Sequence, residues 1–137
     1  MAGGVCVPYR TAVPVEPGLS ARVTLVVAES DTALALRSGD VPVLGTPRLI
    51  ALCEEAACLA VEGKLGDRRT SVGVRVQFDH LAPVRTGSDV VAEATLEKVE
   101  GRRLLFTVTA SDGAGLVGAG KVTRVIVDRE DFLAKAR

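Results

Sequence analysis

The feature that most constrains this chain is an apolar segment with two adjacent glutamates at its centre. The segment LIALCEEAACLAV, residues 49–61, places eleven apolar residues around Glu54 and Glu55. Its apolar residues fall on every side of a helical projection, which predicts a helix that other structure surrounds. Because a globular protein normally keeps glutamate at its surface, the position of these two carboxylates calls for an explanation.

The ends of this helix carry recognisable signals. Thr46 is a suitable N-cap and Pro47 suits the first helical position. Gly63 can supply the left-handed residue that often follows a helix. The sequence therefore predicts one long helix over residues 47–62, about 24 Å in length at roughly 1.5 Å per residue.

Strands dominate the rest of the chain. Residues Val72, Val74, Val76, Phe78 and His80 alternate strictly and are expected to share one face of a strand. The turns EGR and SDGAG are typical of antiparallel hairpins. A short helical turn is expected near Ala33 to Leu36. The predicted strands cover residues 22–28, 71–80, 89–99, 104–110 and 116–127.

A run of antiparallel strands must curl, and an apolar helix needs a surface that encloses it. Both needs are met if the sheet wraps around the helix, which is the α+β hotdog fold. The length of 137 residues fits one domain, residues 1–137. Within it, residues 1–21 are expected to form an irregular lead-in, and residues 129–137 a polar tail or short helix.

Composition excludes several classes of function. Seventeen basic and seventeen acidic residues balance, whereas nucleic-acid binders are usually basic. The longest apolar run, Ala56 to Val61, is far too short to cross a membrane. Three cysteines, an odd number, and an N-terminus without a long apolar stretch indicate a reducing, cytoplasmic location.

The two glutamates occupy different faces of the predicted helix, because adjacent residues point about 100° apart. Glu55 lies two turns from Arg48 and is the better candidate for a solvated carboxylate. Glu54 has apolar neighbours at helical spacing and no basic partner on the helix. Burial of a lone carboxylate is costly, so a residue kept there is a candidate for function.

His80 is the only histidine. It could be a strand-end residue held by a backbone carbonyl, or a general acid–base group suited to neutral pH. No further histidine or cysteine cluster accompanies it, so no metal site is expected. Cys53 and Cys58 point about 140° apart on the helix, and core packing is their expected role.

The segments TPRLIALCEEA, GVRVQFDHLAPVRTG, VEGRRLLFTVTASDG and VGAGKVTRVIV resemble the hotdog thioesterases related to fluoroacetyl-CoA thioesterase, from about Leu44 to the C-terminus. The resemblance implies a catalytic set of Thr46, Glu54 and His80, with Gly73 near the acyl group. It also implies an acyl-CoA substrate, a homodimer with active sites near the subunit interface, and no cofactor beyond the coenzyme A of the substrate.

The segment before the helix departs from the family. The relative that handles fluoroacetate uses phenylalanines there as a lid, whereas the first phenylalanine of this chain is Phe78. A short- or medium-chain acyl-CoA is therefore the expected substrate. Four arginines are candidates for the CoA phosphates: Arg68, Arg69, Arg85 and Arg124.

Two other functions remain open at this point. A non-catalytic acyl-CoA-binding or sensing module would bind the thioester without turning it over. A hotdog enoyl-CoA hydratase would usually carry an Asp-x4-His motif, and Asp79 stands directly before His80 instead. Free N–H groups in the first turn of the helix are candidates for binding the oxyanion of a thioesterase reaction.

Overall fold

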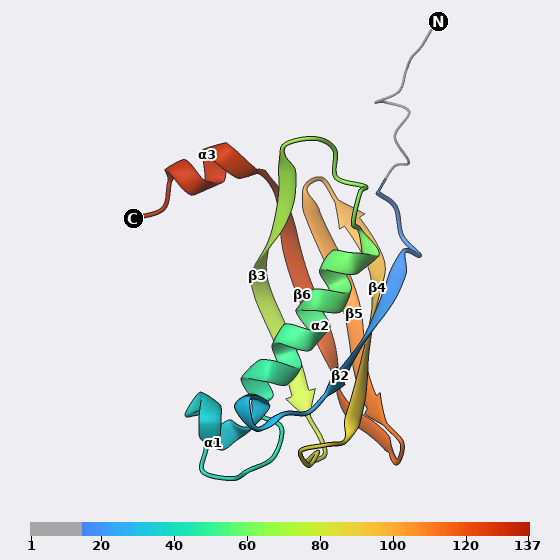
Figure 1. Cartoon of the computed structure of the whole chain (residues 1–137). Coiled ribbons are helices and arrows are strands. Elements are labelled where there is room, and N and C mark those ends of the chain that lie inside the picture. Colours follow the sequence, from blue (N-terminus) through green and yellow to red (C-terminus); the bar gives the residue numbers. More distant parts are fainter. Residues whose placement is uncertain (1–14) are drawn as a thin grey trace, which may run out of the picture.

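The computed structural model describes residues 15–137, in which one long helix lies across a curled sheet (Figure 1). Cys6 and the first fourteen residues of the expected lead-in lie outside the described residues. The elements in chain order are β2 (Ser20–Val26), η1 (Glu29–Asp31), α1 (Ala33–Leu36), α2 (Thr46–Ala60), β3 (Arg69–His80), β4 (Asp89–Glu100), β5 (Arg103–Asp112), β6 (Gly115–Asp128) and α3 (Arg129–Ala134).

The strands form one antiparallel sheet in the order β2-β4-β5-β6-β3. The EGR and SDGAG turns join β4 to β5 and β5 to β6, as predicted. Strand β3 crosses over to pair with β6, so β3 and β2 are the two edges of the sheet within the described residues. The predicted α+β hotdog fold is confirmed, and α3 shows that the C-terminal segment takes the helical alternative.

Strand β3 differs from its predicted pattern. Its pairing with β6 shifts between Gly73 and Arg75, which leaves Val74 as the extra residue of a β-bulge. A bulge exchanges the two faces for the residues on one side of it. Val76, Phe78 and His80 therefore share the inner face with Ser71 and Gly73, and the expectation that Val72 shares this face is wrong.

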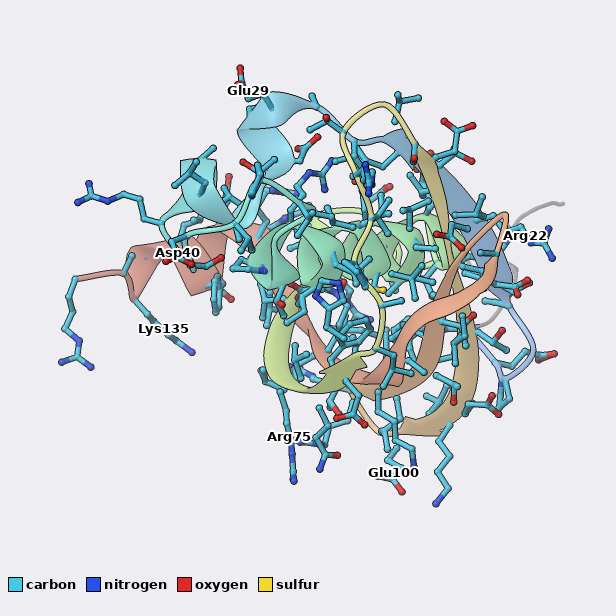
Figure 2. The ribbon with its side chains drawn as sticks, turned by 90° about the horizontal axis from the view of Figure 1, so that it is seen from below. Arg22, Glu29, Asp40, Arg75, Glu100 and Lys135 are labelled. Atoms are coloured by element: carbon cyan, nitrogen blue, oxygen red, sulfur yellow. The ribbon has the colours of Figure 1, made fainter. Side chains whose placement is uncertain are left out.

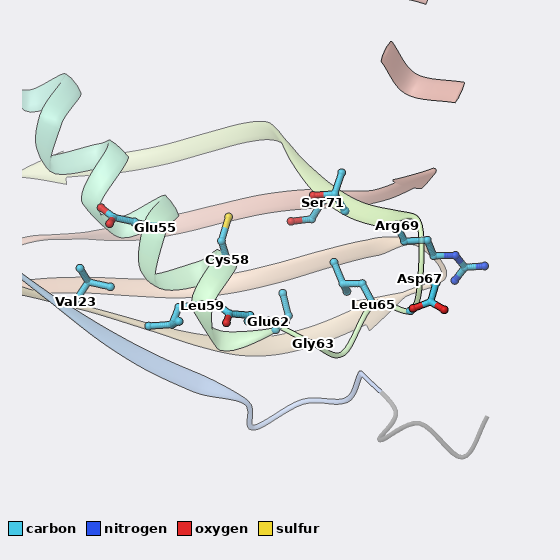
Figure 3. A pocket seen from close by; sticks show the side chains of 13 residues that line it. Val23, Glu55, Cys58, Leu59, Glu62, Gly63, Leu65, Asp67, Arg69 and Ser71 are labelled. Atoms are coloured by element: carbon cyan, nitrogen blue, oxygen red, sulfur yellow. The ribbon is translucent and has the colours of Figure 1, made fainter. Parts of the chain in front are cut away.

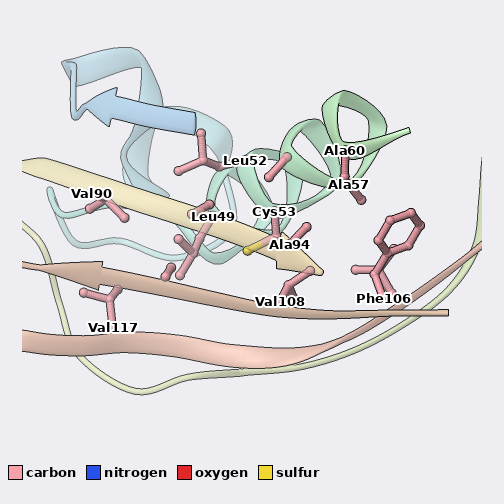
Figure 4. Packing of buried hydrophobic residues seen from close by; sticks show 14 of the residues in the cluster. Leu49, Leu52, Cys53, Ala57, Ala60, Val90, Ala94, Phe106, Val108 and Val117 are labelled. Atoms are coloured by element: carbon pink, nitrogen blue, oxygen red, sulfur yellow. The ribbon is translucent and has the colours of Figure 1, made fainter. Parts of the chain in front are cut away.

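The core lies between α2 and the inner face of the sheet (Figure 4). Full burial of one leucine or phenylalanine stabilises a fold by about 1.5–3 kcal/mol. With three phenylalanines and no tryptophan in the chain, this core depends on aliphatic side chains. The buried residues of α2 are Leu49, Leu52, Cys53, Ala56, Ala57 and Ala60, and they face β-strand residues such as Ala94, Phe106 and Val108.

The composition of α2 predicted a helix that other structure surrounds on every side. In the single chain this expectation is wrong. Ala51, Glu55, Cys58 and Leu59 are exposed and form a stripe along the helix that faces away from the sheet. This stripe, called the outer stripe of α2 below, leaves apolar surface uncovered in the single chain. Strand β3 adds further exposed apolar surface at the sheet edge, where Val74 is 50% exposed and Val76 is 37% exposed.

The ends of α2 also differ from prediction. Gly45, rather than Thr46, is the N-cap residue, and no side chain caps this end. At the other end the C-cap is Val61. Gly63 has the predicted left-handed conformation, with φ of 76°, but it lies two residues beyond this C-cap. The hydroxyl of Thr46 is consequently free for another partner.

Charged side chains lie at the rim of the molecule. Arg22, Glu29, Arg75, Glu100 and Lys135 point outward around the fold when it is viewed from below (Figure 2). Among residues 15–137, no helix combines the length and apolar character that a membrane crossing demands.

Candidate active site

Glu54 lies in the middle of α2 and is paired with Arg124 of β6. Nη1 of Arg124 donates to Oε2 of Glu54 over 3.0 Å. The Glu54 side chain is 32% exposed and that of Glu55 is 58% exposed, in agreement with the predicted faces. Glu55 approaches Arg48 at 3.9 Å, the pairing expected from their helical spacing. Glu54 has no basic partner on its own helix among the described residues, as expected, and its partner Arg124 comes from β6.

Arg124 lies inside the molecule. Its Nε donates to Oγ of Ser71 and its Nη2 donates to the Ser71 carbonyl, each over 2.9 Å. The side chain is 9% exposed. Contact with CoA phosphates would need an exposed guanidinium, so this placement indicates a role at the Glu54 carboxylate instead. Arg68, Arg69 and Arg85 are exposed, as phosphate binding would require.

Gly73 makes room for the carboxylate. It lies opposite Arg124 in the pairing of β3 with β6. A Cβ at this position would come within 2.5 Å of Oε2 of Glu54 and 3.3 Å of Nη1 of Arg124. The close approach of Glu54 to the backbone of β3 therefore requires glycine at residue 73.

Thr46 and His80 form a second pair, at the start of α2. Oγ1 of Thr46 lies 2.7 Å from Nδ1 of His80, and Nε2 of His80 lies 3.1 Å from the carbonyl oxygen of Ala82. A carbonyl oxygen only accepts, so Nε2 carries the hydrogen and Nδ1 of the neutral ring accepts from the Thr46 hydroxyl. A hydroxyl that donates to an imidazole held by a third group is a common arrangement for proton transfer. The contact with a backbone carbonyl expected for His80 is thus present, and its general acid–base role stays a prediction.

A pocket of about 370 Å³ lies beside this pair. The loop between α1 and α2 forms one wall, and the segment after β3 forms the other. Its apolar lining consists of aliphatic side chains, among them Val41, Val43, Leu44, Leu81 and Pro83. Such a pocket suits an aliphatic group more than an aromatic one.

The first turn of α2 offers fewer free N–H groups than predicted. Arg48 and Leu49 both donate to the carbonyl of Gly45, and Pro47 has no N–H group. In the part of the chain that the structure describes, the Thr46 N–H is the remaining donor at this end of α2. An oxyanion bound here would lie close to the Thr46 hydroxyl.

The two pairs are well separated within one chain. Oε2 of Glu54 contacts the position of Gly73, and His80 follows seven residues later on β3. At roughly 3.3 Å per residue this part of the strand spans about 23 Å, and Thr46, the partner of His80, lies about 12 Å from Glu54 along α2 at roughly 1.5 Å per residue. The His80 ring is held near its own end of β3 by Thr46 and Ala82. The predicted set of Thr46, Glu54 and His80 is therefore brought together only in part.

Cys53 packs in the core next to Glu54. Burial, to which the negative charge of Glu54 adds, raises the pKa of the Cys53 thiol to about 11. A thiol with this pKa stays protonated near neutral pH and is a poor nucleophile. Core packing is the role of Cys53, as predicted, whereas the same expectation for Cys58 is wrong because Cys58 is exposed in the single chain.

A larger groove, of about 600 Å³, lies at the C-terminal end of α2 (Figure 3). Leu59 and Leu65 supply apolar surface, and Cys58 and Ser71 lie on its walls. It is lined by Glu55 rather than Glu54, and neither Thr46 nor His80 reaches it. Ser71 joins this groove to the guanidinium of Arg124.

Sequence reasoning missed Ser71 and the contact between Arg124 and Glu54. Seventy positions separate Glu54 from Arg124, and fifty-three separate Arg124 from Ser71. One signal was present: an arginine at residue 124 interrupts the apolar residues that alternate along the last strand. An inward-facing arginine requires buried acceptors, and the nearest unexplained carboxylate is Glu54.

Comparison with known proteins is informative. Residues 27–130 match the family model of the fluoroacetyl-CoA-specific thioesterase. A fluoroacetyl-CoA thioesterase from Streptantibioticus cattleyicolor is 35% identical over 95 residues, which are 69% of this chain and 68% of that protein.

Solved structures agree with this match. The fluoroacetyl-CoA thioesterase FlK superposes with a TM-score of 0.85 at 29% identity, over 90% of this chain and 96% of that one. A hot-dog-like protein from Thermanaerovibrio acidaminovorans superposes with a TM-score of 0.78 at 30% identity, over 87% of each chain.

Proposed function

Because the chain belongs to the family of fluoroacetyl-CoA-specific thioesterases, we propose that it hydrolyses short- or medium-chain acyl-CoA with Glu54, Thr46 and His80. The enzyme is an acyl-CoA thioesterase, which converts a thioester and water into a carboxylic acid and the thiol of coenzyme A. The observation that carries the proposed site is the Glu54 carboxylate, which Arg124 holds at one oxygen and which stays partly exposed.

In the proposed mechanism Glu54 removes a proton from water as the water oxygen attacks the thioester carbonyl. The oxyanion so formed lies near the Thr46 N–H, a preorganised donor. Collapse of the intermediate breaks the C–S bond, and the proton that Glu54 took from water passes through Nδ1 of His80 to the departing thiolate. The proton gained by Glu54 thus equals the proton delivered to sulfur. Direct attack by Glu54, through an anhydride that water then cleaves, uses the same groups.

We further propose that the active site is shared between the two subunits of a homodimer. Within one chain Glu54 is held by Arg124, whereas His80 is held by Thr46 and Ala82 at another part of β3. Among residues 15–137, strand β3 is an edge of the sheet with exposed valines, which another chain can extend by antiparallel pairing. A two-fold axis near Val76 would set Gly73 of one subunit opposite His80 of the other. This pairing would bring Glu54 close to the Thr46–His80 pair of the partner subunit.

The proposed dimer also accounts for the outer stripe of α2. With the β3 strands paired, the two α2 helices would lie side by side on the same face of the continuous sheet. Leu59 and Cys58, which are exposed in the single chain, would then gain cover. An interface of this kind is isologous, so each contact occurs twice.

The substrate class follows from the pocket beside Thr46 and His80. Its aliphatic lining suits the methylene groups of an acyl chain, and among residues 15–137 no phenylalanine, tyrosine or tryptophan lines it. We therefore favour a short or medium acyl chain over a fluorinated acetyl group.

The test is thiol release from acyl-CoAs of two to twelve acyl carbons, measured with wild type, Glu54→Gln and Glu55→Gln. General acid–base catalysis typically contributes about 10²–10⁴-fold, so Glu54→Gln should lose turnover by this factor. Glu55→Gln is the matched control on the same helix and should stay within about threefold of wild type. Saturable binding of acyl-CoA without turnover by wild type would instead support the sensing module.

A further inference from the structure

We propose that Ser71 and Arg124 are positioning residues that orient Glu54 and select its reacting oxygen. This inference rests on the proposed function of Glu54. It concerns how the carboxylate is held, and it assigns a role to Ser71, which lies on a different strand from Arg124 and does not contact Glu54 itself.

Ser71 fixes the plane of the guanidinium. Its hydroxyl oxygen accepts from Nε of Arg124, and its carbonyl oxygen accepts from Nη2. Two nitrogens on the same edge of the guanidinium are therefore bound to one residue. Ser71 and Arg124 are each 8% exposed, which excludes water from these bonds. A planar group held by two such bonds loses its rotational freedom, whereas a free arginine side chain samples many rotamers.

The held guanidinium then directs its remaining nitrogen at Glu54. Nη1 donates to Oε2 over 3.0 Å, and a hydrogen bond between two charged groups is stronger than a neutral one. In the described residues Oε1 makes no hydrogen bond. The oxygen that takes the proton, or that attacks the carbonyl, is therefore Oε1, and Oε2 serves as the anchor.

The bulge in β3 joins this arrangement to the His80 end of the strand. Ser71 and Gly73 lie on the inner face before the bulge, where one offers acceptors to Arg124 and the other leaves space for the carboxylate. A regular strand would keep Ser71 and Gly73 on one face too, but it would turn Val76, Phe78 and His80 to the other face. The bulge thus lets one strand serve both the Glu54 and the His80 ends of the proposed site.

The test compares Ser71→Ala with Ser71→Thr and with Ser111→Ala, a control at an exposed serine of β5. The substrate is the acyl-CoA that wild type hydrolyses fastest. Ser71→Ala removes one acceptor and should lower kcat roughly tenfold with KM unchanged, since the carboxylate remains but is less well oriented. Ser71→Thr keeps the hydroxyl and should retain most of the activity. Ser111→Ala should match wild type.

A second measurement does not depend on turnover. In a ¹H–¹⁵N spectrum of arginine Nε groups, the Nε–H of Arg124 should give a signal that exchanges slowly with water. This signal should be lost or shifted in Ser71→Ala and shifted in Glu54→Gln. If wild type hydrolyses no acyl-CoA, the proposed function fails. The spectrum still reports whether Ser71 and Glu54 hold the Arg124 guanidinium.

Three results would overturn the proposal. One is a Ser71→Ala variant with wild-type kcat and an unchanged Arg124 signal, which would show that Ser71 does not hold the guanidinium. Another is a rise in KM with kcat unchanged, which would make Arg124 and Ser71 contributors to substrate binding. A lower melting temperature with normal kcat would reduce both residues to a structural role.

Discussion

At the scale of single residues, Gly73 offers the sharpest test of how Glu54 is placed. Gly73→Ala would put a methyl group within 2.5 Å of Oε2 of Glu54, so the carboxylate must move away from Arg124. Misplacement of a catalytic group by about 1 Å can cost roughly 10²-fold in rate, and we expect a loss of this order in kcat.

Gly113→Ala is the control for this change, because nothing lies within 4 Å of an added Cβ at that turn. Both variants should fold with melting temperatures near that of wild type. Normal kcat in Gly73→Ala would show that the carboxylate does not need this space for catalysis.

The cysteines of α2 should differ in reactivity. Burial and the charge of Glu54 raise the pKa of Cys53 to about 11, whereas Cys58 is exposed. In a variant that stays monomeric, a thiol reagent at pH 8 should therefore modify Cys58 readily and Cys53 only after unfolding. Peptide mapping by mass spectrometry after a timed reaction distinguishes the two sites. Equal modification of both in the folded protein would contradict the placement of Cys53.

The raised pKa of Cys53 also sets the sign of a stability effect at alkaline pH. The unfolded thiol ionises near its ordinary pKa of 9.0, and the folded thiol only near 11. Between these values the unfolded state binds fewer protons, so stability falls as pH rises through this window. Replacement of Cys53 by alanine should remove this part of the decline.

At the scale of elements, the inner face of α2 should carry its stability and the outer stripe should not. Leu52 is 1% exposed and faces the sheet, whereas Leu59 is 45% exposed. Leu52→Ala should lower the free energy of unfolding by about 2–5 kcal/mol, since it removes buried surface and leaves a cavity. Leu59→Ala, the same change on the same helix, should cost less than about 1 kcal/mol when both variants are compared in a monomeric background. Urea denaturation of both variants compares them directly.

Periodicity predicted most of the elements. Helix α2, the turn α1 and the hairpins of β4, β5 and β6 follow from local patterns that the sequence displays. The β3 bulge could not be predicted, because it depends on how Gly73 and Arg75 pair with residues of β6 some fifty positions away. The N-cap was also misplaced, since the hydroxyl of Thr46 bonds to His80 rather than to its own helix.

The candidate site was predictable in its parts and not in its arrangement. Helical faces separated Glu54 from Glu55, and the solitary histidine pointed to His80. The partner of Glu54 was invisible, because no local pattern connects it with Arg124 across seventy residues. The separation of Glu54 from His80 follows only from the length of β3.

At the scale of the whole molecule, the exposed edge of β3 should determine the oligomeric state. In the proposed dimer Val76 lies near the two-fold axis, so Val76→Lys would bring two positive charges together at the interface. We expect a monomer by light scattering, with loss of thioesterase activity. Val26→Lys changes a more exposed valine on the opposite edge strand and should leave the dimer intact. Dissociation by both variants would place the interface elsewhere.

The shared active site is tested most directly by mixing two inactive subunits. Glu54→Gln and His80→Asn chains, carrying different tags, are co-expressed and their mixed dimers are assayed for thiol release. If Glu54 of one subunit works with His80 of the other, each mixed dimer keeps one of its two sites intact. Mixed dimers make up about half of an equal mixture, so the mixture recovers about a quarter of wild-type turnover. A mixture as inactive as either parent would contradict the shared site and place Glu54 and His80 in separate functions.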